Sequence, residues 1–203
     1  MRGRKMTKTD ENLKAAFAGE SQARNKYTYF ARVAEKEGYH YVAKIFEETA
    51  INEMQHAKEE FKLLKGISNT EKNLQEAING EHYETKTMYP DFEKQAKLDG
   101  NKAAEILFRE TGEVEEQHEK RYKKLLQLLK DGKLYVREND IRWKCSKCGY
   151  IHVGKEPPEK CPCCHHEKQY YEPECMCFAD DCECCALPKS DGSKDDKLKK
   201  KKN

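Results

Sequence analysis

Apolar and polar residues follow each other along residues 9–131 with the three-to-four-residue spacing of amphipathic helices. The segment is rich in Ala, Glu, Lys, Leu and Gln, which favour helix, and Pro90 is its only proline. Three glycine-containing breaks divide it, as is typical of helix ends. We expect Pro90 to kink the third helix or to interrupt its hydrogen bonding for a turn. The pattern predicts four helices, at about 10–36, 40–65, 70–98 and 102–130.

The pattern changes after Gly132. Residues 141–174 carry paired cysteines, prolines and aromatic residues. This segment is too short to form a stable core without a cross-link such as a bound metal. Five further cysteines and a Lys-rich stretch follow, and this composition favours a flexible tail. We therefore predict three regions: a four-helix bundle in residues 1–136, a small cysteine-bound domain in 137–174 and a tail in 175–203.

Each predicted helix has an apolar stripe that a glutamate interrupts near its middle, and on two helices this glutamate begins a Glu-x-x-His pattern. One such polar residue is usually a satisfied core group, but four stripes interrupted in the same way indicate a shared site. Another Glu-x-x-His, at Glu37 and His40, spans a helix break and is expected at the surface. The interrupting residues and their histidines are Glu20, Glu53, His56, Glu81, Glu84, Glu115 and His118.

The numbers of residues between these glutamates and the helix breaks place their side chains at one level along the predicted bundle. Glu20 and Glu53 lie 18 and 15 residues from the break at Gly38, and Glu84 and Glu115 lie 16 and 15 residues from Gly100. Desolvating one carboxylate costs several kcal/mol, so five together need cations, and two ferrous or ferric ions would supply them. Carboxylate and imidazole suit iron or manganese. One glutamate from each of two helices and Glu-x-x-His from each of the others form a di-metal carboxylate site.

All ten cysteines follow residue 144, and in a reducing compartment such crowding indicates metal binding rather than disulfides. Two Cys-x-x-Cys turns predict a tetrahedral four-sulfur site for zinc or a single iron, with a structural zinc ribbon as the alternative. We expect Cys163 to face away from this site. The cysteines of segment 175–185 could bind a soft metal, act as a redox-active patch or have no fixed structure. The four predicted ligands are Cys145, Cys148, Cys161 and Cys164.

Composition excludes some functions. The net charge of +2 argues against nucleic-acid binding. A charged fraction of 37% and a mean hydropathy of -1.09 argue against a membrane protein. The N-terminal MRGRKMTKTD lacks the apolar stretch of a signal peptide, so we expect a cytoplasmic protein.

Five motifs between about Thr9 and Pro173 resemble the rubrerythrin family: AFAGESQARNKYTYFA, IFEETAINEMQHA, INGEHYETKTMYP, EVEEQHEKRY and RWKCSKCGYIHVGKEPPEKCPCC. The resemblance implies an all-α, ferritin-like four-helix bundle with a non-haem di-iron site, and a small C-terminal rubredoxin-like β domain with one iron on four cysteines. It also implies a peroxidase that protects an anaerobe or microaerophile from oxidative stress. Such an enzyme reduces hydrogen peroxide to water with electrons from NAD(P)H, delivered through a reductase.

The resemblance also implies roles for single residues. Glu53 and Glu115 would bridge the irons, and Glu20, Glu81 and Glu84 would be terminal ligands. His118 would bind one iron, and His56 would bind the other in the reduced state, in exchange with Glu84. The hydroxyls of Tyr27 and Tyr89 would hydrogen-bond to the carboxylate ligands; the alternative role of both is a core aromatic residue.

The link at 66–70 departs from the ferritin-like pattern, which runs the second and third helices parallel. Five extended residues reach about 17 Å, whereas a return along a 25-residue helix covers nearly 40 Å. We therefore expect a domain-swapped homodimer, with a simple up-down-up-down bundle as the alternative. Two other functions stay open: a ferroxidase or iron-storage protein, and a zinc-ribbon interaction module on a helical bundle. Zinc could also substitute for iron at the cysteines.

Overall fold

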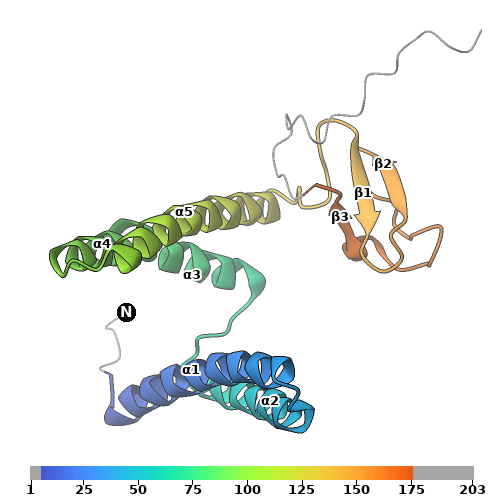
Figure 1. The fold of residues 1–203 in the computed structure, drawn as a ribbon. Coiled ribbons are helices and arrows are strands. Elements are labelled where there is room, and N and C mark those ends of the chain that lie inside the picture. The colour runs from blue at the N-terminus through green and yellow to red at the C-terminus, as the bar shows by residue number, and fades with distance from the viewer. Residues whose placement is uncertain (1–5, 176–203) are drawn as a thin grey trace, which may run out of the picture. The chain divides into compact units, whose positions relative to one another are not determined.

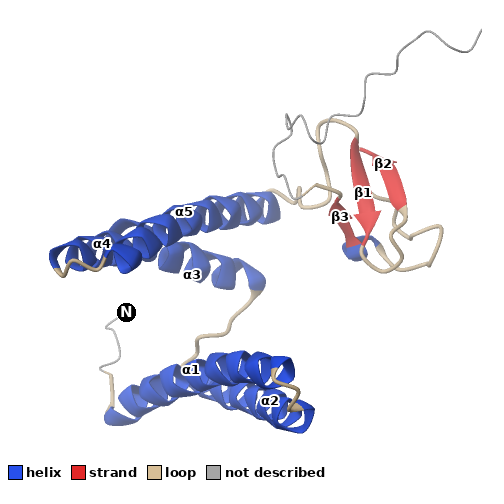
Figure 2. Ribbon diagram, viewed as in Figure 1, coloured by secondary structure: helices blue, strands red, loops and turns tan. Residues whose placement is uncertain are grey.

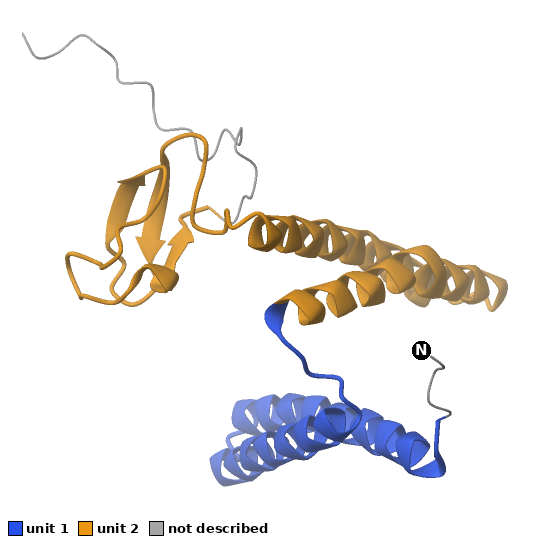
Figure 3. Ribbon diagram, turned by 180° about the vertical axis from the view of Figure 1, so that it is seen from behind, with its two compact units in different colours: residues 1–70 blue, residues 71–203 orange. Residues whose placement is uncertain are grey.

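Helical segments precede a small sheet in the computed structural model, which describes residues 6–175 (Figures 1 and 2). The chain divides into two compact units, residues 1–70 and 71–203 (Figure 3). No helix in the described range is long and apolar enough to cross a membrane. The helices are α1 (Lys8–Lys36), α2 (His40–Leu63), α3 (Thr70–Tyr83), the π-helix η1 (Glu84–Met88), α4 (Tyr89–Leu98) and α5 (Lys102–Lys130). The remaining elements are β1 (Ile141–Cys145), β2 (Ile151–Gly154), the 3-10 helix η2 (Lys168–Tyr170) and β3 (Tyr171–Pro173).

The first unit is a hairpin of α1 and α2. Thr7 and Asp10 form a capping box at the start of α1, and Gly38 ends the helix with a φ of 84°, a conformation that favours glycine. Between the helices the ring centroids of Phe17 and Phe61 stack 4.7 Å apart. Small buried residues allow the two backbones to approach closely, and these are Ala31, Ala34, Ala43, Ala50 and Ala57.

Gly66, in the link after α2, is required for steric reasons. A Cβ at this position would overlap the ring of Phe61, the residue that stacks on Phe17. The left-handed residue at this break is Lys65, with a φ of 59°, and not the glycine that marked the break in the sequence.

The second unit contains a hairpin formed by the α3–η1–α4 segment and α5. The interruption expected from Pro90 is the π-helical turn of η1, which ends with the Tyr89 N–H donating to the carbonyl of Glu84. Asn101 caps α5 by accepting a hydrogen bond from the Ala104 N–H. Phe92 of α4 packs against Phe108 of α5.

The second unit also contains a three-stranded antiparallel sheet in the order β2-β1-β3. Side chains of β1 alternate between buried and exposed, and Trp143 at its centre is fully buried. The Trp143 indole N–H donates to the carbonyl of Gly154, and Arg137 lies over the same ring. The hydrophobic cluster at the core of this domain contains five buried residues, Ile141, Trp143, Cys145, Cys161 and Tyr171.

Candidate metal centres

The α1–α2 hairpin brings Glu20, Glu53 and His56 together, with one potential ligand atom of each within 4.8 Å of the others. The Nδ1 atom of His56 lies 2.8 Å from Glu53 Oε2 and 3.9 Å from Glu20 Oε2. Glu53 and His56 share a face because they are three residues apart on a helix. A hydrogen bond with the Glu53 carboxyl raises the pKa of Glu20. Glu20 therefore holds its proton more readily, and a metal ion would replace that proton.

The hairpin of the second unit repeats this arrangement with Glu81, Glu115 and His118. The Nδ1 atom of His118 lies 2.6 Å from Glu115 Oε2 and 3.7 Å from Glu81 Oε2. Burial, and then a hydrogen bond with Glu115, raise the pKa of Glu81. Each hairpin thus presents two carboxylates and one imidazole, a donor set that fits an iron or manganese ion.

Glu84 begins the π-helical turn and is not one of the three clustered residues of its hairpin. Its charge nevertheless helps to raise the pKa of Glu81 and of Tyr89. For Tyr89 the largest cause is burial, followed by the charges of Glu115, Glu84 and Glu81. The Tyr89 hydroxyl therefore experiences the field of the carboxylates. The hydrogen bond from this hydroxyl to a carboxylate stays a prediction.

Tyr27 lies in the other hairpin, where its ring packs 6.0 Å from that of Phe46 and 6.3 Å from that of Phe30. These contacts fit the core-aromatic role. The predicted hydrogen bond from Tyr27 to a carboxylate stays a prediction.

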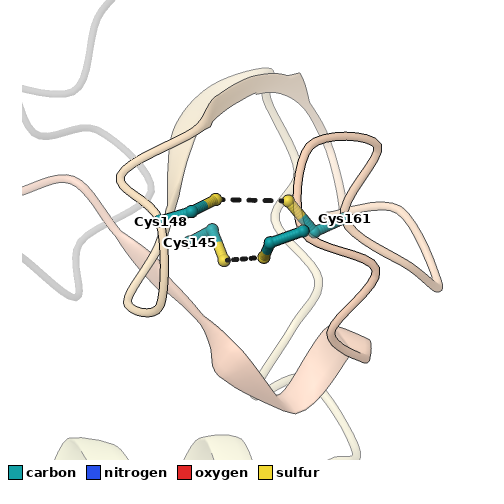
Figure 4. Close-up of side chains that lie close together, drawn as sticks. Cys145, Cys148 and Cys161 are labelled. Carbon is teal, nitrogen blue, oxygen red and sulfur yellow. Dashed lines mark hydrogen bonds between the residues drawn. The ribbon is translucent and has the colours of Figure 1, made fainter.

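The four-cysteine site is complete within one small domain (Figure 4). Cys145 and Cys164 have their Sγ atoms 3.7 Å apart, and those of Cys148 and Cys161 are 3.6 Å apart. A metal–sulfur bond of about 2.3 Å places the sulfurs of a tetrahedral site about 3.8 Å apart. All four cysteines are free of disulfides. The geometry therefore fits a tetrahedral metal ion.

The two turns that carry these cysteines have similar backbones. Gly149 follows the first pair with a φ of 78°, and its N–H donates to the carbonyl of Cys145. His165 takes the corresponding place after the second pair, with a φ of 60° and a bond from its N–H to the carbonyl of Cys161. Both turns thus fold back so that their two sulfurs converge.

Other predictions at cysteines and histidines can be located. Cys163 is exposed and free, outside the four-sulfur cluster. His40 is exposed and lies beside Glu35, as expected for the Glu-x-x-His pattern of Glu37 and His40 that spans a helix break. The cysteines of segment 175–185 lie outside the described residues except Cys175, which is disulfide-bonded.

Sequence reasoning missed two polar contacts near the predicted ligands. Glu119 is buried, and its Oε1 accepts from Lys123 Nζ at 2.6 Å and lies 2.9 Å from His82 Nδ1. His166 places its Nδ1 atom 3.3 Å from Cys164 Sγ. Neither Glu119 nor His82 interrupts an apolar stripe, so helical spacing could not identify the pair.

Comparison with known proteins gives two family matches. The model of the rubrerythrin family matches residues 11–126, and that of the rubrerythrin rubredoxin-like domain matches residues 143–172. The expected fold class, a ferritin-like helical domain followed by a rubredoxin-like β domain, is confirmed.

Three relatives span most of the chain. A putative rubrerythrin of Methanocaldococcus jannaschii is 40% identical over 192 residues, which cover 84% of this chain and 94% of the relative. Rubrerythrin of Porphyromonas gingivalis is 42% identical, covering 83% and 91%. Rubrerythrin of Nitratidesulfovibrio vulgaris is 40% identical, covering 85% and 97%. The chain therefore belongs to the rubrerythrin family, di-iron proteins that generally detoxify peroxide and bind a further iron through four cysteines.

Proposed function

We propose that this chain is a cytoplasmic non-haem di-iron peroxidase that reduces hydrogen peroxide to water and limits oxidative stress in an anaerobe or microaerophile. Its electrons come from NAD(P)H through a reductase and then through the iron of the four-cysteine site. One observation carries the proposal: a single chain holds two three-ligand carboxylate clusters and a complete four-sulfur site. A storage protein needs no such one-electron relay.

The di-iron assignment draws on both hairpins. Glu53 and Glu115 would hold both irons, Glu20, Glu81 and Glu84 would be terminal ligands, and His118 would bind one iron. His56 would bind the other iron in the reduced state, in exchange with Glu84. Support comes from exposure, because 60% of the His56 side chain is accessible against 37% for His118. A loosely packed imidazole can move between two positions with little cost in packing.

The chemistry needs two electrons and two protons for each peroxide, which becomes two waters. Bound iron would supply the electrons and act as a Lewis acid on the peroxide oxygens. The carboxylates would hold the two ions and offset their charge. A tyrosine phenol is protonated at neutral pH, so the Tyr89 O–H can donate to a carboxylate ligand and orient it. Tyr27 takes the matching role in the first hairpin.

We propose that the complete di-iron site forms in a domain-swapped homodimer. The connection from Leu64 to Asn69 reaches about 20–25 Å. Helix α2 has 24 residues and is about 36 Å long, so one chain cannot place α2 and α3 parallel with this link. A second copy can supply the complementary hairpin.

Exposed apolar residues on the ligand faces support this assembly. Ile45 and Leu107 each lie 11 residues before the ligand histidine of their helix, which places them on the same face as that histidine. Their exposed fractions are 44% and 62%. Apolar side chains aligned with charged ligands indicate a surface that another helix pair covers. We also propose the domain boundaries predicted from the sequence: the helical domain ends at residue 136 and the four-cysteine domain at residue 174.

The functional test replaces Glu115 by alanine and uses Glu116→Ala as the matched control, because Glu116 is half-buried and pairs with Lys86 and Lys120 rather than with the ligand cluster. Peroxide consumption is measured with NAD(P)H and a rubredoxin reductase, together with the visible spectrum. We expect Glu115→Ala to lose turnover while the red ferric tetrathiolate remains, and Glu116→Ala to stay active. Undiminished turnover in Glu115→Ala would refute the proposal. Iron uptake without peroxide turnover in the unmodified protein would favour storage, and a colourless zinc-loaded protein would favour the interaction module.

A further inference from the structure

Tyr171 carries a buried hydroxyl that lacks a partner. It begins β3, lies opposite Cys145 in the antiparallel register and is only 4% exposed. Within the described part of the chain, its Oη atom has no hydrogen-bond partner. Burying a hydroxyl without a partner costs free energy, and buried tyrosines usually find one. Phenylalanine would fill the same space without this cost, so the hydroxyl needs an explanation.

The surroundings of Tyr171 contain sulfur. Its side chain belongs to the buried cluster that also contains Trp143, Cys145 and Cys161. Trp143 already uses its indole N–H on a backbone carbonyl. The two cysteines have the other polar atoms of this cluster's side chains, and both belong to the four-sulfur site.

Of the two sulfurs in this cluster, that of Cys161 is the one with which the Tyr171 hydroxyl interacts through its side chain. A tyrosine hydroxyl is protonated at neutral pH and therefore has a hydrogen to donate.

We propose that the Tyr171 hydroxyl donates a hydrogen bond to the Cys161 sulfur of the metal-loaded site and thereby raises the reduction potential of its iron. The proposal rests on the iron occupancy proposed above. Hydrogen bonds to ligand sulfurs are among the groups that tune such potentials. The ferrous centre with four thiolates carries one more negative charge than the ferric centre, so a donor stabilises the ferrous form more. Tyr171 is a positioning residue that makes the relay easier to reduce.

The first test compares Tyr171→Phe with Tyr135→Phe in the full-length protein. Tyr135 packs against the same cluster, but its hydroxyl donates to the carbonyl of Gln169 and not to sulfur. The readout is the midpoint potential of the four-cysteine iron, followed by its visible absorption during electrochemical titration. At a fixed potential we expect the ratio of reduced to oxidised iron to fall about three- to tenfold in Tyr171→Phe, tenfold being about 59 mV. Tyr135→Phe should match the unmodified protein.

The second test detects the hydrogen bond without iron or activity. In protein loaded with ¹¹³Cd, the Tyr171 hydroxyl proton should exchange slowly and show scalar coupling to the metal across the O–H···S bond. An unchanged potential in Tyr171→Phe, or a hydroxyl proton without coupling, would overturn the inference. Failure of the proposed function would look different: iron-replete cells would yield colourless, zinc-loaded protein, while the cadmium result would still report on Tyr171.

Discussion

The four-cysteine site and the carboxylate clusters differ in how the chain builds them. The sulfurs come from residues 145–164, inside one small domain, and form a complete set of four ligands. The carboxylate and imidazole ligands come from residues 20–118, and each compact unit holds one cluster of three of them. The first site therefore needs only local folding, whereas the proposed di-iron site needs the two clusters to be assembled.

The two kinds of site also contribute differently to stability. Two of the five residues in the core cluster of the small domain are cysteine ligands, so the metal site supplements a small hydrophobic core. The helical hairpins are held by alanine packing and aromatic stacking, and their ligands lie partly exposed on one face. Removing metal should thus unfold the small domain and leave the hairpins folded.

The largest expected effect is that of Cys145→Ser. Loss of a fully buried ligand should remove the metal and unfold the domain. Trp143, the only tryptophan of the chain, reports on this domain because it is fully buried there. We expect its fluorescence to shift to the red and the tetrathiolate absorption to vanish, while bundle iron is retained. The exposed Cys163→Ser is the control and should change neither signal. A buried-type emission from Cys145→Ser would show that the domain folds without its metal.

The sequence predicted the local features well, for identifiable reasons. Gly38 and Gly100 end helices where expected, because both take a positive φ that other residues rarely adopt. The Cys-x-x-Cys pairs form one cluster because each turn is fixed by its own backbone hydrogen bonds.

Features that depend on neighbouring helices were not predictable. Helical spacing placed Glu119 off the apolar stripe, yet it is buried, and its carboxylate pairs with Lys123 and lies within hydrogen-bond distance of His82. The sequence indicated an interruption near Pro90 but not its π-helical form. The buried hydroxyl of Tyr171 also had no signal in the sequence, because strand β3 is only three residues long.

The next largest effect should follow from lengthening the link after α2. About fifteen Gly and Ser residues inserted between Gly66 and Ile67 give the link enough reach to return along α2. We expect the unmodified protein to be a dimer and the lengthened protein to become a monomer that keeps its iron. Light scattering after size-exclusion chromatography measures the oligomeric state, and iron analysis measures the iron content.

The control for this experiment is the same insertion after Gly132, which lies beyond the helices that carry ligands. It should leave the dimer intact. A stable, unmodified monomer that binds both irons of the di-iron site would exclude the domain swap and favour the up-down-up-down bundle.

The smallest expected effect is that of Ala31→Leu, in the packing between α1 and α2. Ala31 is 2% exposed, so a larger side chain must push the helices apart, which typically costs about 1–3 kcal/mol. Ala18→Leu on the same helix is the control, because Ala18 is exposed. Thermal unfolding followed by circular dichroism should show a lower midpoint for Ala31→Leu alone. Iron titration should show weaker binding, since Glu20 lies on α1 and its partners on α2, while the tetrathiolate colour stays unchanged. An equal loss of iron from the carboxylate clusters and from the four-cysteine site would contradict this comparison. It would mean that the small domain depends on the packing of the helical hairpin.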